Sequence, residues 1–158
     1  MPLPRARPSK RPMTGARPPR LYTPEVLALA TGLAAFPLDD SLVLRGEARS
    51  RTCGSDMVVG IDLTPAGRIA RVGMQIRACA IGQASAALLA QAAPGRSAED
   101  LARVHDGLEA WLAGSGDLPE WPDLALLAPA RAHTARHGAL LLPWTAASKA
   151  LSSGAIAR

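Results

Sequence analysis

The chain has 158 residues, within the usual range of about 100 to 200 residues for a single domain. It carries 18 Lys and Arg against 13 Asp and Glu, a formal net charge of +5. Six of these cations lie in residues 1–20, where no acidic residue occurs, which leaves 12 basic against 13 acidic residues in the remainder. A nearly neutral domain gives no electrostatic reason to expect a nucleic-acid partner.

The first 20 residues also contain six of the 14 prolines and almost no large apolar side chain. Such a composition cannot bury a core, so we expect a disordered, basic, Pro/Arg-rich tail over residues 1–20. The folded domain is expected over residues 21–151, with a flexible C-terminus over residues 152–158. No stretch approaches the about 20 apolar residues that cross a bilayer, and the tail lacks the apolar core of a secretory signal. We therefore expect a cytoplasmic protein.

The pattern of apolar residues in the first half of the domain predicts one helix followed by three strands. Thr23 and Pro24 form a helix start, and the apolar spacing after them predicts a helix that ends near Phe36. Alternation of apolar and polar residues predicts strands over 57–63 and 72–76, joined by a turn at 64–67, and a weaker edge strand over 42–48.

The second half of the domain has the spacing of helices. One helix is predicted from Cys79 to Pro94, and a second begins at the capping box that starts with Ser97. Further helices are predicted over 124–127 and 139–151, the latter disturbed by Pro143. Strands followed by helices imply an α+β fold, a small three-stranded antiparallel sheet with four to five helices packed on it.

Both cysteines of the chain, Cys53 and Cys79, lie at the ends of predicted elements. In a chain without an export signal, thiols or metal ligands are expected rather than a disulfide. The start of a helix at Cys79 favours its thiolate form. The spacing of the two cysteines by itself is more typical of small buried residues than of metal ligands.

The sequence around these cysteines resembles a known family. Residues 79–86 read C-A-I-G-Q-A-S-A, and C-G-S-D stands at 53–56. With L-Y at 21–22, G-R-S at 95–97 and P-A-R at 129–131, the chain resembles the U-type iron-sulfur cluster assembly scaffolds (IscU, SufU and NifU) over residues 21–151. The resemblance implies a scaffold that accepts persulfide sulfur from a cysteine desulfurase, binds iron, assembles a transient [2Fe-2S] cluster and passes it to apoproteins.

The chain departs from this family at the third cysteine. If the last helix is aligned, His137 matches a family histidine and Gly138 replaces the cysteine. If the P-A-R segment is aligned instead, Thr134 replaces it. The chain has only two cysteines under either alignment. In addition, Asp56 stands one residue later than the family's aspartate, and the family's chaperone motif is absent near Pro129, which weakens the expectation of the usual chaperone partner.

We hypothesise that Cys53, Cys79, His137 and Asp56 are the ligands for iron or a cluster, because imidazole and carboxylate can complete a site with two thiolates. Cys79 and Cys53 are also the candidate persulfide acceptors. His133 is the alternative to His137.

Two alternative functions remain open: a zinc-dependent, SufU-like sulfurtransferase that uses the same four side chains, and a degenerate paralogue that assembles nothing. A non-enzymatic scaffold is preferred over a sulfurtransferase. His105 is predicted to be a partly buried, satisfied residue, and the three tryptophans are predicted to be packing residues. The sequence indicates no oligomeric state.

Overall fold

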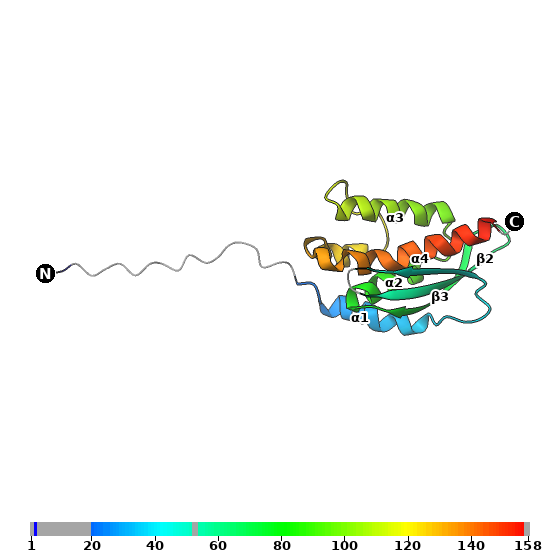
Figure 1. The fold of residues 1–158 in the computed structure, drawn as a ribbon, viewed down its shortest axis with the longest axis horizontal. Helices are drawn as coiled ribbons and strands as arrows, with labels where there is room; N and C mark the ends of the chain where they lie inside the picture. The colour runs from blue at the N-terminus through cyan, green and yellow to red at the C-terminus, as the bar shows by residue number, and fades with distance from the viewer. Residues whose placement is uncertain (1, 3–19, 52–53, 157–158) are drawn as a thin grey trace.

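The computed structural model describes residue 2 and residues 20–51 and 54–156. Its elements in chain order are α1 (Pro24–Gly32), η1 (Leu33–Ala35), β1 (Leu44–Arg49), β2 (Asp56–Leu63), β3 (Ile69–Arg77), α2 (Ala80–Ala92), α3 (Ala98–Leu112), η2 (Leu124–Ala132), η3 (Thr134–Arg136) and α4 (His137–Ile156), where η marks a 3-10 helix. The predicted α+β class is confirmed (Figure 1). Cys53 and nearly all of the predicted tail lie outside the described residues.

The three strands form one antiparallel sheet in the order β1-β2-β3, so β1 lies at an edge as predicted. The predicted hairpin between β2 and β3 is confirmed by the hydrogen bond from the amide of Gly67 to the carbonyl of Thr64, at 2.9 Å. Gly67 has φ of 80°, a value that glycine adopts without strain. The register pairs Asp56, the first residue of β2, with Arg77, the last residue of β3.

Side-chain caps begin two of the helices where the sequence predicts them. The hydroxyl of Thr23 accepts a hydrogen bond from the amide of Val26 at 3.2 Å and starts α1. At α3, the amide of Asp100 donates to the hydroxyl of Ser97, and the carboxylate of Asp100 accepts from the amide of Ser97, at 3.2 and 2.9 Å. This reciprocal pair is the predicted capping box.

The last helix differs from its prediction. Proline lacks the amide that would bond to the carbonyl four residues earlier, which costs about 3 kcal/mol inside a helix. Even so, α4 runs unbroken through Pro143 and continues to Ile156, beyond the expected end at 151. Buried side chains on both sides of the proline, Leu140 and Trp144, hold the helix against the rest of the fold. The tertiary packing of α4 outweighs the local preference.

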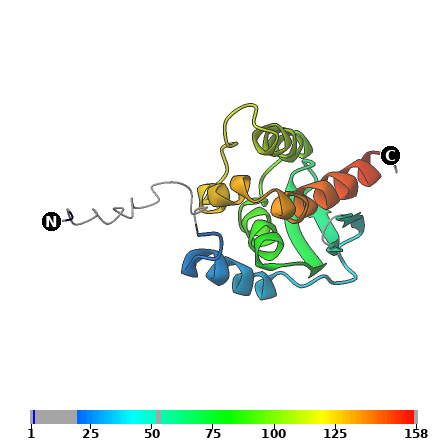
Figure 2. The same ribbon diagram turned by 60° about the vertical axis from the view of Figure 1, so that its left-hand side comes forward.

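The helices form a layer against the sheet (Figure 2). Helix α4 packs on β1 and β2, with α2 beside it, while α1 packs on α2 and α3 packs on α4. One buried apolar cluster joins all of these elements. Within the described part of the chain, no helix is both long enough and apolar enough to cross a bilayer.

Candidate functional site

The strands bring Asp56 and Cys79 to one end of the sheet. Asp56 begins β2 and is paired in register with Arg77, and Cys79 follows Arg77 by two residues as the N-cap of α2. The loop from β1 to β2 lies at this same end, where the amide of Ser50 donates to the carbonyl of Ser55 at 2.8 Å. The loop contains Cys53, which is outside the described residues.

The start of α4 lies at this same end. Gly82, in the first turn of α2, faces α4 so closely that a β-carbon there would lie 3.3 Å from the carbonyl oxygen of Ala139. One turn further along α2, the hydroxyl of Ser85 donates to the carbonyl of Leu140 at 2.7 Å. The two helices therefore begin at the same end of the molecule. This arrangement places Cys79 and His137 at neighbouring helix N-termini, whose backbone dipoles favour negative charge.

Asp56 is held by an arginine. The Nε and Nη2 atoms of Arg77 donate to the two carboxylate oxygens of Asp56, at 3.2 and 2.7 Å. Hydrogen bonding by Arg77 is the main cause that lowers the pKa of Asp56 below its usual value, and the charges of Arg77 and Arg49 act in the same direction. The carboxylate is thus charged at neutral pH, and each of its oxygens keeps a second lone pair beside the contact with Arg77.

His137 is oriented by a backbone carbonyl. Its Nε2 atom lies 2.9 Å from the carbonyl oxygen of Arg131. A carbonyl oxygen only accepts hydrogen bonds, so Nε2 carries the proton and Nδ1 of the neutral ring keeps a free lone pair. Histidine ligands commonly donate their second N-H in this way. The alternative ligand, His133, has its Nε2 atom buried without a hydrogen-bond partner among the described residues.

The predicted ligands share an end of the fold without closing into a tight cluster. Cys79 is a free, half-buried thiol. Within residues 20–51 and 54–156, the only three His, Cys, Asp or Glu ligand atoms within 4.8 Å of one another belong to His105, Asp106 and Glu109 on α3. Cys79, Asp56 and His137 form no such set, and the fourth predicted ligand, Cys53, is not described. The complete ligand set stays a prediction.

His105 has the structural role that the sequence predicts. The ring is partly buried, and its Nε2 atom lies 3.1 Å from the hydroxyl of Thr145 on α4. Asp106 and Glu109, which complete the group of three ligand atoms, are both exposed and lie on the same helix. The histidine therefore joins α3 to α4 through a side-chain hydrogen bond.

A hollow of about 390 Å³ opens between the end of β1 and the first four turns of α4. We call it the basic hollow, because Arg49, Arg51 and Lys149 line it together with His137. Sequence reasoning missed these cations, since the two arginines and the lysine are far apart in the chain. The signal in the sequence is the alternation of the small residues Ala48 and Ser50 with Arg49 and Arg51. In the structure the two small residues are buried and both arginines face outward.

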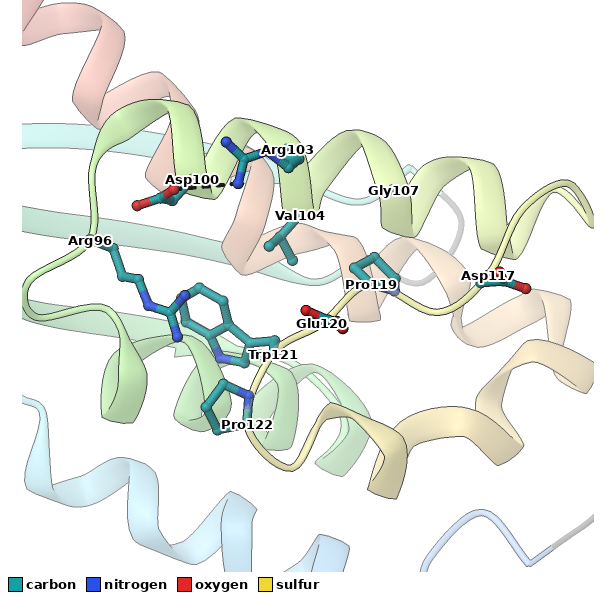
Figure 3. A pocket seen from close by; sticks show the side chains of 10 residues that line it. All are labelled: Arg96, Asp100, Arg103, Val104, Gly107, Asp117, Pro119, Glu120, Trp121 and Pro122. Carbon is teal, nitrogen blue, oxygen red and sulfur yellow. Dashed lines mark hydrogen bonds and ion pairs between the residues drawn. The ribbon is translucent and has the colours of Figure 1, made fainter.

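A second hollow, of about 620 Å³, lies between α3 and residues 117–122 (Figure 3). The guanidinium group of Arg96 lies 4.6 Å from the ring centre of Trp121, and the indole Nε1 of Trp121 donates to the carbonyl of Leu88 at 2.8 Å. None of the predicted site residues lines this hollow. Trp121, like Trp111 and Trp144, is a buried packing residue, as predicted.

The architecture is shared with solved structures. A nitrogen-fixing NifU-like protein (N-terminal) from Brucella abortus matches with a TM-score of 0.75 and 26% identity, covering 84% of this chain and 92% of that chain. The fold is that of the U-type scaffolds. A putative iron-sulfur cluster assembly scaffold protein for the SUF system from Fervidobacterium islandicum AW-1 also shares the U-type fold, with a TM-score of 0.72, 19% identity and coverage of 83% and 96%.

A third solved structure, of a hypothetical protein, has a TM-score of 0.57 and 22% identity, with coverage of 80% of this chain and 96% of that chain. No family model and no curated protein matches the chain. The resemblance to U-type scaffolds that the sequence indicates is therefore supported at the level of the fold. It covers nearly the whole length of the matched chains.

Proposed function

We propose that this chain is an iron-sulfur cluster assembly scaffold. The observation that carries the proposal is the meeting of Cys79, Asp56 and the start of α4 at one end of a U-type fold. The two most similar structures described above are a NifU-like protein and a putative iron-sulfur cluster assembly scaffold. A half-buried thiol, a carboxylate and an imidazole with a free Nδ1 are suitable ligands for iron.

In the proposed sulfur-transfer step, the thiolate of Cys79 attacks the outer sulfur of a persulfide on a cysteine desulfurase. A new S-S bond forms at Cys79 while the desulfurase S-S bond breaks, and the desulfurase cysteine leaves as a thiolate, so the exchange involves no net oxidation. The N-terminus of α2 favours the attacking anion. Cys53 is the second candidate acceptor.

Iron and the [2Fe-2S] cluster are the cargo of this site. Cys53 and Cys79 would supply thiolates, His137 would bind through Nδ1, and Asp56 would bind through a lone pair that Arg77 does not use. Imidazole can replace thiolate on cluster iron, as in Rieske centres. A set with only two thiolates binds soft cargo less firmly than four would, which suits release to a receiving apoprotein.

Anaerobic reconstitution tests the proposal, with ferrous iron, cysteine, a desulfurase and a non-thiol reductant that converts persulfide sulfur to sulfide, followed by visible absorbance and iron and sulfide analysis. We expect a cluster on the parent protein, none on Cys79→Ser and a shorter-lived one on His137→Ala. His105→Ala is the matched control, because His105 lies on α3 and is not one of the predicted ligands.

Two other outcomes would overturn the proposal. A parent protein without absorbance or bound iron would favour a degenerate, non-assembling paralogue. Stoichiometric zinc and no visible absorbance, in protein purified without added metal, would favour the zinc-dependent sulfurtransferase.

A further inference from the structure

The lining of the basic hollow carries an excess of positive charge. Its cations are Arg49, Arg51 and Lys149, and no residue that the structure describes in its lining is acidic. Within the described parts of the chain, none of the three makes an ion pair. The carboxylates of Glu47 and Asp56 lie just outside this lining, beside Arg49 and Lys149, and the charge of Arg49 acts on Asp56. Outside the first 20 residues the chain has slightly more acidic than basic residues, so this local excess of positive charge is a property of the hollow.

The hollow is elongated along α4. Gly154 faces Leu44 and Gly46 faces Ala146, so β1 and α4 run in opposite directions. Arg51 therefore lies toward the end at His137, and Lys149 lies toward the other. At about 1.5 Å per residue, the stretch of α4 from His137 to Lys149 is about 18 Å long.

Both positions that could have carried the missing cysteine line the same hollow. Thr134 replaces that cysteine under one alignment and Gly138 under the other, and each contributes to the wall of the basic hollow. Neither residue can offer a thiolate, and the chain holds only two cysteines. A small thiol bound in the hollow would therefore lie next to Thr134 and Gly138, the two positions at which the family's third cysteine is replaced.

We propose that the basic hollow binds a small thiol that bears carboxylates, the class to which the tripeptide glutathione belongs, and that this thiol supplies the missing thiolate to the cargo. The claim that the bound thiol is a ligand of the cargo rests on the proposed function. Carboxylates pair strongly with arginine and lysine. An extended tripeptide spans about 10 Å, which is shorter than the hollow, and volumes of about 300 to 1,000 Å³ are typical of small-molecule sites. The thiol proton is released to solvent when sulfur binds iron.

Binding is tested by calorimetric titration of the metal-free protein with three probes. Reduced glutathione and S-methylglutathione should bind with similar affinity, because both keep their carboxylates, whereas glutathione diethyl ester should bind about tenfold more weakly. Arg49→Gln and Lys149→Gln should each weaken glutathione binding severalfold. Arg103→Gln, an exposed cation on α3, should not. Equal affinity for the diester, or unchanged affinity in both hollow variants, would overturn the proposal.

The role of the thiol is tested by anaerobic reconstitution with each probe. The cluster should last several times longer with glutathione than with S-methylglutathione, and Gly138→Cys or Thr134→Cys should give this longer lifetime without either probe. A cysteine variant that holds a cluster while glutathione does not bind would overturn this inference and leave the proposed function standing. If glutathione binds but neither the parent nor the cysteine variants assemble a cluster, the proposed function fails, and the thiolate role with it.

Discussion

The side chain of Ser85, on α2, connects the indole of Trp144 to the backbone of α4, the helix that contains Trp144. The indole Nε1 of Trp144 donates to the hydroxyl of Ser85 at 3.0 Å, and that hydroxyl donates to the carbonyl of Leu140 at 2.7 Å. All three residues are fully buried. Ser85 belongs to the segment C-A-I-G-Q-A-S-A that carries the family resemblance. This segment therefore joins α2 to α4, in addition to supplying Cys79.

Replacing Ser85 by alanine should lower the free energy of unfolding by about 1 to 3 kcal/mol, because the buried indole N-H loses its acceptor and the carbonyl of Leu140 loses its donor. Urea denaturation measures the change. Ser153→Ala is the control, since among the described residues that hydroxyl bonds to the carbonyl of Ala150 alone and Ser153 is exposed. Equal losses in the two variants would contradict a special role for Ser85.

Gly46→Ala should destabilise the contact between β1 and α4. A β-carbon at Gly46 would collide with the carbonyl oxygen of Ala146 and lie 2.5 Å from the amide nitrogen of Ala150. Backbone atoms cannot move aside cheaply, so we expect a loss of about 3 kcal/mol in thermal denaturation. Gly32→Ala is the control, because the nearest atom to its added carbon is Nε2 of Gln91 at 3.8 Å. A Gly46→Ala protein as stable as the parent would contradict the close approach.

Asp56 should contribute to stability in a pH-dependent way. Arg77 lowers the pKa of Asp56 in the folded chain, so the stabilisation is present above the unfolded value of about 4 and is lost as the pH falls through the lower folded value. The difference in melting temperature between the parent and Asp56→Asn should therefore be constant near neutral pH and shrink below about pH 4. Asp117→Asn, at an exposed position, should show no such trend. A difference in melting temperature that grows as the pH falls would contradict this prediction.

Trp121 should be more sensitive than Trp111 to replacement by phenylalanine. The indole N-H of Trp121 donates to the carbonyl of Leu88 in the core, and the Trp121 ring meets Trp144 edge to face at 4.9 Å. Loss of the hydrogen bond adds about 1 kcal/mol to the cost of the smaller ring. Trp111 is also buried, but the hydrogen bond that it accepts uses its backbone carbonyl and not its side chain. Chemical denaturation compares the two variants, and equal losses would refute the importance of the N-H.

Much of the fold follows from short-range patterns in the sequence. The cap at Thr23, the capping box at Ser97, the turn at 64–67 and the alternation along β2 and β3 all appear where they are predicted. Each depends on residues within one turn or one hairpin, so local chemistry is sufficient to predict it. The position of Cys79 at the start of a helix was predictable for the same reason.

The site depends on contacts that no local pattern contains. The pairing of Asp56 with Arg77, the continuity of α4 through Pro143 and the basic hollow between β1 and α4 all join residues far apart in the chain. By itself, the sequence determined the order of elements, the supply of two thiols and the absence of a third. Only the tertiary structure decided which charges and helix ends meet, because those contacts arise from the packing of α2 and α4 on the sheet.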